Sequence, residues 1–478
     1  MHSQVVVLGG GPGGYAAAFL AADLGMEVAI VEADSRLGGT CLLRGCIPSK
    51  ALLHVAKVIS EAREMAQWGI TFEPPRLSVE KLRARKEQVI ATLTGGLAQL
   101  AKRRNVRVVH ARGVFVDSQT LQLEGGDPAT YDDGRLTFDH CILATGSVPA
   151  MPKTFQIKSD RVMDSSGALE LAEVPETLLV VGGGYIGLEM ATVYSELGTR
   201  VSVVELLDGL LPGADRDLVK PLEKKLRESL EQILLSTKVV AVREVGGKVE
   251  VEMETPGGEK LTSAYDRVLV SVGRRPKSFG FGLENTRVTL DDKGFVRVDD
   301  QQRTSDPHIL AIGDVAGEPM LAHKASHEGK VAAEVLAGEP AAFDKAAIPA
   351  VVFTDPEIAW AGVTVEQAKR EGRAVQVAQY PWQASGRAIA NARTDGLTKL
   401  VIDPESDRVI GCGIVGYGAG ELIAEAVLAI EMGCTARDMG ETIHPHPTLS
   451  ETVGFGAEAY LGTATEIFKP RRRQTQEN

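Results

Sequence analysis

The amino-acid sequence predicts an α/β protein that contains two similar strand–turn–helix units and a separate C-terminal α+β domain. Two glycine-rich turns, at residues 9–14 and 182–187, each follow an apolar stretch typical of a buried parallel strand and precede a helix-forming stretch. An acidic residue ends the next expected strand in both units, because Glu32 follows Gly9 and Glu205 follows Gly182 by the same 23 residues. From Arg274 the pattern changes, and residues 348–478 are typical of a separate α+β domain.

Composition excludes several classes of protein. The 478 residues exceed a single core, so two to four domains are expected. The net charge of −12 argues against nucleic acid or an anionic membrane as a partner, and the short basic run at residues 469–473 is interpreted as a frayed tail. Residues 5–22 carry no charge and resemble a membrane span or a signal peptide in that respect, but Pro12 and the glycines favour a strand–turn–helix unit. We therefore expect no targeting segment.

Cysteine usage indicates a reducing compartment. Five cysteines in so long a chain do not make a disulfide framework, so we expect a cytoplasmic protein. Cys141 falls in an apolar strand pattern and is expected in the core, whereas Cys412 and Cys434 have no partner motif and are assigned no chemistry. No metal site is expected.

Residues 38–50 hold the cysteines with the strongest chemical signal, Cys41 and Cys46. Pro48 suits the first turn of a helix, and a thiol at a helix N-terminus is stabilised as thiolate by the helix dipole. We interpret the two cysteines as a disulfide that is made and broken in each turnover. The alternatives are a structural staple, which would contribute only about 2 kcal/mol for so small a ring, and half of a zinc site, for which no second ligand pair follows at finger-like spacing.

The glycine turns match a dinucleotide-binding fingerprint. The pattern G-x-G-x-x-G stands at Gly9, Gly11 and Gly14 and again at Gly182, Gly184 and Gly187. Glycine allows a pyrophosphate to approach the backbone, the helix N-terminus stabilises its charge, and the acidic residue accepts from a ribose hydroxyl. Two Rossmann-like sites are therefore predicted, with two turn-rich loops that bind nothing as the alternative.

The residues after Glu205 favour NAD over NADP at the second site. Leu206, Leu207 and Asp208 include no arginine to meet a 2′-phosphate. Arg200 is the nearest basic residue, but it precedes the strand and is expected to face solvent.

Between and after the turns, periodicity predicts the remaining elements. Asp314 ends an expected strand at residues 309–314, where its carboxylate could accept from a polyol chain; a helix N-cap is the alternative, which the pattern alone favours. The other expected elements are helices at 52–67, 79–104, 323–336 and 420–432, short strands within 106–123, an exposed turn near 125–128, and strands at 142–146, 268–273, 350–353, 357–363, 397–402 and 409–415.

Near the C-terminus, His446 and Glu451 are candidates for an acid–base pair. With a helix starting near Pro447, the carboxylate would accept from one ring nitrogen, fix the tautomer and leave the other nitrogen as a base. A turn with two surface histidines, His444 and His446, is the alternative.

Taken together, these motifs resemble the FAD-dependent pyridine nucleotide–disulfide oxidoreductases, class I, over essentially the full length. The resemblance rests on the cysteine segment 38–50, Thr145 and Gly146, residues 182–189, Asp314 with its preceding glycine, and residues 446–451. It implies two Rossmann-like dinucleotide-binding domains, one for FAD and one for NAD, plus a C-terminal α+β dimerisation domain. The implied boundaries are a first FAD part at 1–148, an NAD domain at 149–273, a central domain completing the FAD site at 274–347, and an interface domain at 348–478.

The resemblance also implies a role for each matching residue. Cys41 would be the thiol that exchanges with substrate, and Cys46 the thiol that faces the flavin. Lys50 would lie by the flavin and pair with Glu189 near the nicotinamide. His446, oriented by Glu451, would be the acid–base group and would come from the opposite subunit of a homodimer. The implied cofactor-binding residues are Gly9, Gly11, Gly14, Glu32, Lys50, Thr145, Gly146, Gly182, Gly184, Gly187, Glu205, Gly273, Asp314 and Ala322.

Within the family, the chain is most similar to members that oxidise dihydrolipoyl groups with NAD+. The expected partner is then the lipoyl-bearing subunit of a 2-oxo acid dehydrogenase or glycine cleavage complex. Leu43 and Arg44 replace the usual Asn-Val between the cysteines, and Pro445 replaces the usual Ala; Arg44 is expected to face solvent. The alternatives are another NAD(P)H-dependent disulfide reductase of the family and a flavin-binding scaffold protein.

Overall fold

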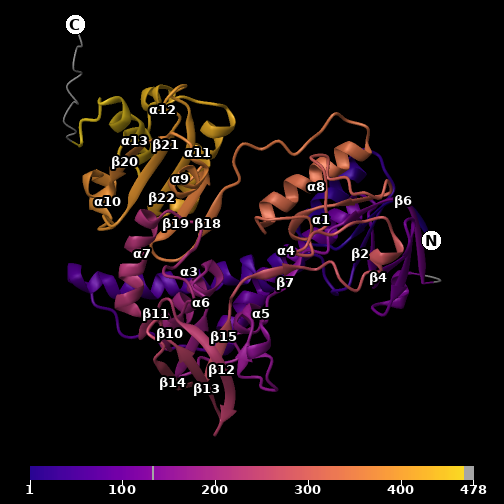
Figure 1. The fold of residues 1–478 in the computed structure, drawn as a ribbon, viewed down its shortest axis with the longest axis horizontal. Helices are drawn as coiled ribbons and strands as arrows, with labels where there is room; N and C mark the ends of the chain where they lie inside the picture. The colour runs from indigo at the N-terminus through magenta and orange to yellow at the C-terminus, as the bar shows by residue number, and fades with distance from the viewer. Residues whose placement is uncertain (132–133, 468–478) are drawn as a thin grey trace. The chain divides into compact units, whose positions relative to one another are not determined.

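The computed structural model describes residues 1–131 and 134–467, so the basic run at 469–473 lies outside the described residues. The chain forms two compact units (Figure 1). Unit 1 contains Met1–Pro175, Val242–Val249 and Arg267–Asp344, and unit 2 contains Glu176–Ala241, Glu250–Asp266 and Lys345–Asn478. Each unit carries one of the two glycine turns.

Unit 1 is organised around a mixed seven-stranded sheet in the order β3-β2-β1-β6-β5-β4, with β17 also paired to β6. The pairs β2–β3, β1–β2, β1–β6 and β6–β17 are parallel, whereas β5 runs antiparallel to both β4 and β6. The parallel strands place their carboxyl ends at one edge, where the glycine turn follows β1. The bounds are β1 (His2–Leu8), β2 (Val28–Glu32), β3 (Arg107–His110), β4 (Arg112–Asp117), β5 (Thr120–Glu124), β6 (Arg135–Leu143) and β17 (Ile309–Ala311).

Strand β1 is buried on both faces, as its continuous apolar run predicts. Val5 and Val7 pack in one core cluster with Ala17 and Ala18 of α1 (Pro12–Asp23), while Val6 pairs with a second cluster on the other face of the sheet. Helix α8 (Ala322–Leu336) packs on α1 and contributes Val331 to the first cluster (Figure 1).

The remaining elements of unit 1 connect these parts. Strand β7 (Ser147–Pro149) pairs antiparallel with β16 (Arg274–Pro276), and β8 (Val162–Met163) pairs parallel with β15 (Arg267–Val270). The others are α2 (Gly39–Arg44), α3 (Cys46–Glu64), η1 (Met65–Trp68), α4 (Val79–Arg103), η2 (Pro128–Thr130), η3 (Lys153–Phe155), α5 (Ser165–Glu170), η4 (Leu283–Asn285) and η5 (Gly313–Val315).

Unit 2 repeats the strand–turn–helix pattern and adds an antiparallel sheet. Strands β9 (Thr177–Val181), β10 (Arg200–Val204) and β11 (Gln232–Leu234) are parallel, with α6 (Tyr185–Glu196) after the second glycine turn and α7 (Arg216–Ser229) after β10. Strands β12 (Lys238–Val245), β13 (Lys248–Glu254) and β14 (Lys260–Tyr265) follow in the chain. The antiparallel sheet has the order β18-β19-β22-β21-β20. Its elements are β18 (Ala350–Val352), β19 (Glu357–Gly362), α9 (Val365–Glu371), β20 (Gln376–Pro381), η6 (Trp382–Ala384), α10 (Gly386–Ala390), β21 (Leu397–Ile402), β22 (Val409–Gly416), α11 (Ala419–Glu431), α12 (Ala436–Glu441) and α13 (Glu451–Leu461).

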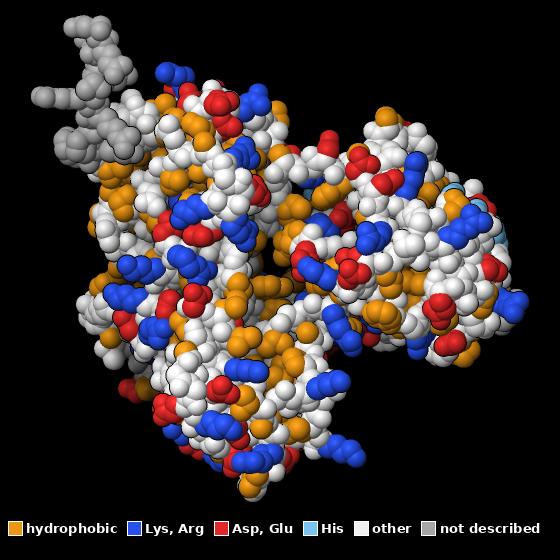
Figure 2. Space-filling view, viewed as in Figure 1, with side chains coloured by type: hydrophobic (Ala, Val, Ile, Leu, Met, Phe, Trp, Pro, Cys, Tyr) orange, Lys and Arg blue, Asp and Glu red, His pale blue; other side chains and the backbone are white. Residues whose placement is uncertain are grey.

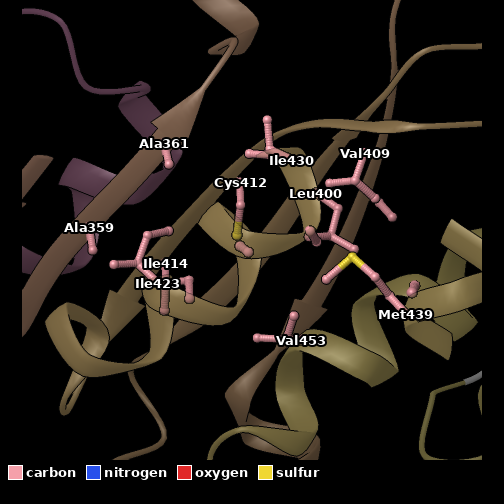
Figure 3. Close-up of a cluster of buried hydrophobic side chains, with 14 of the residues drawn as sticks. Ala359, Ala361, Leu400, Val409, Cys412, Ile414, Ile423, Ile430, Met439 and Val453 are labelled. Atoms are coloured by element: carbon pink, nitrogen blue, oxygen red, sulfur yellow. The ribbon is translucent and has the colours of Figure 1, made fainter. Parts of the chain in front are cut away.

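The core of the antiparallel sheet is apolar and closely packed. Leu400, Cys412 and Ile414 of the sheet face Ile423 of α11 and Val453 of α13 (Figure 3). Burial raises the pKa of Cys412 to about 12, so this thiol stays neutral and acts as a small apolar side chain. The core therefore gives α13, and with it Glu451, a rigid support.

The surface mixes charges of both signs. Lys and Arg side chains alternate with Asp and Glu across the face that Figure 2 shows. Among the described residues, no helix combines the length and the apolar character needed to cross a membrane.

Most expected elements are present within one or two residues, and Pro48 lies in the first turn of α3, as expected. The strands expected at 142–146, 268–273 and 309–314 end earlier, at Leu143, Val270 and Ala311, and the first of them begins at Arg135. The helix expected to start near Pro447 begins only at Glu451. There the Glu451 carboxylate accepts from the Thr448 backbone N–H at 2.7 Å, which holds the preceding residues in a loop. Cys141 is fully buried, and the turn at 125–128 is exposed, as expected.

Candidate functional site

The first glycine turn brings backbone segments closer than any side chain would allow. A Cβ on Gly14 would lie 1.9 Å from the Gly9 carbonyl oxygen, and one on Gly9 would lie 2.3 Å from the Ala144 carbonyl oxygen. Gly9 also adopts a φ of +114°, which favours glycine. Gly11 is the N-cap of α1, and no side chain caps this helix end, so its first backbone N–H groups suit an anionic ligand.

Glu32 is held rigidly beside this turn. Its Oε2 accepts from the Gly10 N–H at 2.6 Å, its Oε1 accepts from the Asp34 N–H at 2.9 Å, and the residue is 8% exposed. Two N–H donors fix the carboxylate as an acceptor, and its remaining lone pairs suit ribose hydroxyls.

The cysteine segment lies directly on the first turn. The Gly38 N–H donates to the Gly10 carbonyl at 2.8 Å, and a Cβ on Gly39 would lie 2.6 Å from the Gly11 Cα. Cys41 lies in the short helix α2, and Cys46 is the first residue of the 19-residue helix α3. The glycines thus bring the thiols to the same edge of the sheet as Glu32.

The two thiols interact electrostatically. The hydrogen bond with the Cys46 side chain raises the pKa of Cys41, and burial adds to this effect, whereas the charge of Lys50 opposes it. Burial also raises the pKa of Tyr15, and the negative charge of both sulfurs adds to that shift, which places Tyr15 beside the pair. The two thiols are therefore coupled to each other, and Cys46, at the N-terminus of α3, is the one that the helix dipole favours as a thiolate.

Arg44 faces solvent, as expected, and also binds a neighbour. Its side chain is 42% exposed, and its guanidinium donates to Asp34, two residues after Glu32. The sequence did not indicate this contact with Asp34.

Asp314 lies in a 3₁₀ turn and does not cap the next helix. The N-cap of α8 is Leu321, so the N-cap interpretation was wrong. The Asp314 carboxylate accepts from the Ser147 hydroxyl at 2.5 Å, and this hydroxyl accepts from Arg274 Nε at 2.8 Å. Gly146 and Gly273 adopt positive φ values of 73° and 117° on the two sides of this β7–β16 pair.

A buried ion pair supports the turn that carries Asp314. Glu328 of α8 accepts from the Gly313 N–H at 2.7 Å and contacts Lys324 Nζ at 2.6 Å, and both side chains are almost fully buried. Ala322 begins the same helix, and the Thr145 hydroxyl donates to the Lys277 carbonyl at 2.7 Å.

The second glycine turn, in unit 2, repeats the first. The Gly183 N–H donates to Glu205 Oε2 at 2.6 Å, and the Leu207 N–H donates to Oε1 at 2.8 Å. A Cβ on Gly187 would lie 2.3 Å from the Gly182 carbonyl oxygen. Gly184 is the N-cap of α6, as Gly11 is of α1. Arg200 pairs with Glu176 at 2.6 Å and is exposed, as expected.

Glu189 is buried on α6. It is 3% exposed, and its Oε1 accepts from the Phe353 N–H at 3.1 Å. Lys50 belongs to unit 1 and Glu189 to unit 2, so their expected pairing stays a prediction.

His446 and Glu451 meet as their spacing indicated. Nδ1 of His446 lies 2.8 Å from Glu451 Oε1, which assigns the proton to Nδ1, because a carboxylate only accepts. The His446 side chain is 78% exposed, whereas that of Glu451 is 10% exposed. Glu451 thus orients the His446 ring through Nδ1, and Nε2 is accessible to solvent.

His444 is engaged differently, which sequence reasoning missed. Its Nδ1 lies 2.9 Å from the Thr442 carbonyl oxygen and its Nε2 lies 2.6 Å from Glu425 Oε1, and its side chain is 10% exposed. His444 is therefore held by a carbonyl oxygen on one side of the ring and a carboxylate on the other. Ser147, Arg274 and Glu328 were missed as well. Ser147 and Arg274 stand next to Gly146 and Gly273, whereas Glu328 had no signal in the sequence.

The comparisons with known proteins agree with this geometry. A family model described as pyridine nucleotide-disulphide oxidoreductase matches residues 3–329, and the dimerisation domain of the same family matches residues 348–455. The chain belongs to the pyridine nucleotide-disulphide oxidoreductase family. It is therefore an oxidoreductase with the predicted α/β fold class.

Individual proteins of this family are similar to the chain over nearly its full length. The chain is 50% identical over 467 residues to a dihydrolipoyl dehydrogenase of Vibrio cholerae, covering 98% of this chain and 97% of the relative. Its fold matches the crystal structure of LpdA from Mycobacterium tuberculosis with a TM-score of 0.87 at 27% identity, covering 95% and 99% of the two chains. It also matches the HOCl-induced flavoprotein disulfide reductase RclA from Escherichia coli with a TM-score of 0.82 at 26% identity, covering 94% and 98%.

The residues present fit the cofactors of this family, FAD and NAD. Each glycine turn forms a cradle that a Cβ would fill, and each ends beside a carboxylate fixed by two backbone N–H groups. Among the described residues, no group of three or more His, Cys, Asp or Glu side chains could hold a metal ion.

Proposed function

We propose that this protein oxidises dihydrolipoyl groups to lipoyl groups with NAD+ as the electron acceptor, through a Cys41–Cys46 disulfide and FAD. The single observation that carries the proposal is the placement of the two interacting thiols on the first glycine turn. Around that pair we assign FAD to the turn with Glu32, Thr145, Gly146, Gly273, Asp314 and Ala322, and NAD to the turn with Glu205.

The thiol chemistry follows from the residues. His446 removes a proton from one substrate thiol, and the resulting thiolate attacks Cys41 and displaces Cys46 as a thiolate. The second substrate thiol then attacks the substrate sulfur of the mixed disulfide, and its proton passes to the departing Cys41 sulfur. Lipoamide leaves, with Cys41 as a thiol, Cys46 as a thiolate and the proton of the first substrate thiol still on His446.

Each remaining residue has a defined task. Glu451 holds the His446 tautomer, and the N-terminus of α3 stabilises the Cys46 thiolate. Bound FAD would supply the two-electron link between the thiols and the pyridine nucleotide, because thiols do not hand hydride directly to nicotinamide. Lys50 and Glu189 are proposed to pair beside the flavin and nicotinamide.

The proposed active site needs two copies of the chain. The match to the family's dimerisation domain at residues 348–455 supports a homodimer, in which His446 of one copy serves Cys41 of the other. We infer the domain order 1–148, 149–273, 274–347 and 348–478. The proposed partner is the lipoyl-bearing subunit of a 2-oxo acid dehydrogenase or glycine cleavage complex, and cysteine usage supports a cytoplasmic location.

The test is a steady-state assay of the purified yellow protein with dihydrolipoamide and NAD+, repeated with NADP+ and with glutathione disulfide plus NADPH. We expect turnover only with the first pair. Cys46→Ser should lower kcat by about a thousandfold or more and leave the flavin bound, since it removes the leaving thiolate. Cys434→Ser is the matched control, because this cysteine has no assigned chemistry, and it should keep full activity. Equal rates with NADP+, or an active Cys46→Ser variant, would contradict the proposal.

A further inference from the structure

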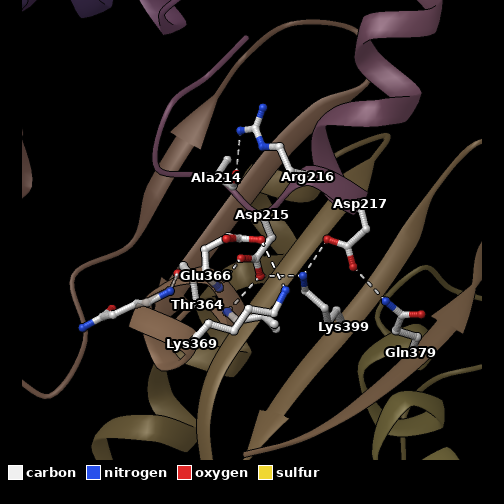
Figure 4. Close-up of polar contacts among 11 residues, drawn as sticks. Ala214, Asp215, Arg216, Asp217, Thr364, Glu366, Lys369, Gln379 and Lys399 are labelled. Atoms are coloured by element: carbon white, nitrogen blue, oxygen red, sulfur yellow. Dashed lines mark hydrogen bonds and ion pairs between the residues drawn. The ribbon is translucent and has the colours of Figure 1, made fainter. Parts of the chain in front are cut away.

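Lys399, a fully buried cation far from both glycine turns in sequence, lies between two aspartates of unit 2. Its Nζ is 2.5 Å from Asp215 Oδ2 and 2.6 Å from Asp217 Oδ1, and its side chain is 2% exposed (Figure 4). Lys399 belongs to β21 of the antiparallel sheet, whereas the aspartates stand at the start of α7, which follows the second dinucleotide unit. A buried charge of this kind costs desolvation energy, so its arrangement calls for a structural or functional reason.

Asp215 is further engaged by the backbone of α9. Its carboxylate accepts from the Val365 N–H at 3.1 Å and from the Glu366 N–H at 3.0 Å. Burial acts to raise the pKa of Asp215, but the hydrogen bonds from Lys399 and α9 outweigh it and lower the pKa. The Asp215 side chain is therefore charged and fixed by three donors from the C-terminal domain.

The segment held in this way, residues 206–214, lies against the second glycine turn. The Leu211 N–H donates to the Gly183 carbonyl at 2.9 Å, and a Cβ on Gly183 would lie 2.6 Å from the Leu210 side chain. The Gly183 N–H in turn donates to Glu205. Residues 206–214 thus support the second glycine turn and Glu205, the two groups that are assigned to the nucleotide.

One residue of this segment is strained. Leu211 has a φ of +50°, an unfavourable conformation for leucine. Leu210 and Leu211 are buried, whereas Leu206 and Leu207 are 64% and 47% exposed. The Arg216 guanidinium, next to Asp215, donates to the carbonyls of Leu210, Leu211 and Ala214 at 2.7 Å each, and Figure 4 shows the bond to Ala214. The ties to Arg216 and Asp215 therefore add to the burial of Leu210 and Leu211 in holding the strained backbone.

We infer that Lys399 and Asp215 are positioning residues for the pyridine nucleotide: they anchor residues 206–214 to the C-terminal domain and so preorganise the glycine turn and Glu205. This inference rests on the proposed NAD site. It predicts that nucleotide affinity depends on a lysine that does not touch the nucleotide.

The experiment compares Lys399→Met and Asp215→Asn with wild type in the flavin-loaded full-length enzyme. The probe is ADP-ribose, which carries the adenosine and pyrophosphate but no redox centre, and its Kd is measured by calorimetry. We expect Kd and the KM for NAD+ to rise about tenfold, with unchanged flavin content and an unchanged KM for dihydrolipoamide. Asp215→Asn keeps the size of the side chain and provides a second test if Lys399→Met does not fold.

Lys225→Met is the matched control. Lys225 Nζ lies 2.6 Å from Asp355, so it also ties α7 to the C-terminal domain, but farther along the helix than residues 206–214. This variant should lose stability and keep the wild-type Kd for ADP-ribose. A wild-type Kd in both Lys399→Met and Asp215→Asn, or an equal rise in Lys225→Met, would overturn the inference. Wild-type enzyme that binds ADP-ribose without oxidising dihydrolipoamide would instead overturn the proposed function alone.

Discussion

The two glycine turns are built alike and covered differently. In each, a glutamate stands 23 residues after the first glycine: Glu32 in the first unit and Glu205 in the second. Its carboxylate accepts from one backbone N–H of the glycine turn and from the backbone N–H of the residue two positions after the glutamate. The first turn, however, lies under the cysteine segment, and its helix is packed against α8, where a Cβ on Gly329 would lie 2.5 Å from the Gly13 carbonyl oxygen. The second has Ile186 at the position of Gly13 and exposed neighbours such as Tyr185 and Leu206.

This difference teaches how one local motif serves two kinds of ligand. A cofactor that stays bound through many turnovers benefits from cover on several sides, since release requires those contacts to open. A nucleotide that enters and leaves in every turnover needs an exposed site with a preorganised backbone. In both units the local sequence positions the carboxylate and the glycine turn. Segments that are distant in the sequence determine how much of each turn is covered.

The largest expected effect comes from adding a methyl group inside the turns. Gly14→Ala would place a Cβ 1.9 Å from the Gly9 carbonyl oxygen, so the strand and helix must separate. We expect the flavin content to fall below about a tenth of wild type. Gly187→Ala, with its 2.3 Å contact, should keep the flavin and lose nucleotide affinity.

The measurement is the ratio of flavin to protein absorbance after purification, followed by ADP-ribose binding. Gly95→Ala is the control, because a Cβ there meets nothing within 4 Å. Normal flavin content in Gly14→Ala would show that the first turn is not the FAD site.

The second effect concerns a buried ion pair of unit 2. Asp355 accepts from Lys225 at 2.6 Å and from Arg393, whose side chain is 8% exposed. Burial acts to raise the pKa of Asp355, but the two cations outweigh it and lower the pKa. Asp355→Asn should therefore cost about 3–5 kcal/mol of unfolding free energy at pH 7, since it leaves a buried cation without its charge partner.

The sign of the pH dependence follows from the lowered pKa. The stabilisation is present above about pH 4, the ordinary value for Asp, and is lost as the pH falls through the folded value. Urea unfolding at pH 7 and pH 3.5 should show a smaller difference between wild type and Asp355→Asn at the lower pH. An equal difference at both values would mean that Asp355 does not act through its charge.

Much of this organisation could be predicted from the sequence, because its signals are local. Each glycine turn lies in one continuous stretch of sequence together with its neighbouring strand ends and its glutamate, Glu32 or Glu205. His446 and Glu451, which contact each other, are only five positions apart. The ties of Lys399 to Asp215, and of Gly329 to Gly13, join residues more than 180 positions apart, and a single sequence has no periodic signal for such pairs. The start of α13 was misplaced for a different, local reason, since the Glu451 carboxylate accepts from the Thr448 N–H and so holds the residues before the helix in a loop.

A smaller effect is expected when one carboxylate loses its charge. Glu205→Gln keeps the size of the side chain, but one of the two backbone N–H groups loses its acceptor and the charge-assisted hydrogen bonds to ribose weaken. The KM for NAD+ should therefore rise about tenfold. Glu32→Gln should leave that KM unchanged and instead ease loss of flavin on dilution. Steady-state kinetics and flavin release by gel filtration separate the two. If either variant impaired both ligands, the two sites would not be independent.

The smallest effect is expected at Arg44, the departure between the cysteines. Its ion pair with Asp34 joins the cysteine segment to the loop after Glu32, but the two side chains are 42% and 38% exposed. Exposed pairs contribute about 0–1 kcal/mol, because water competes for both charges. Arg44→Val, which restores the usual residue of the family, should therefore change the free energy of unfolding by less than about 1 kcal/mol and leave flavin content and the KM for NAD+ unchanged. Urea unfolding and dihydrolipoamide turnover over pH 6–9 check this. A shift of the pH profile with unchanged stability would show that the guanidinium charge acts on the thiols, and the cover over the first turn would then contribute to the reaction as well as to cofactor retention.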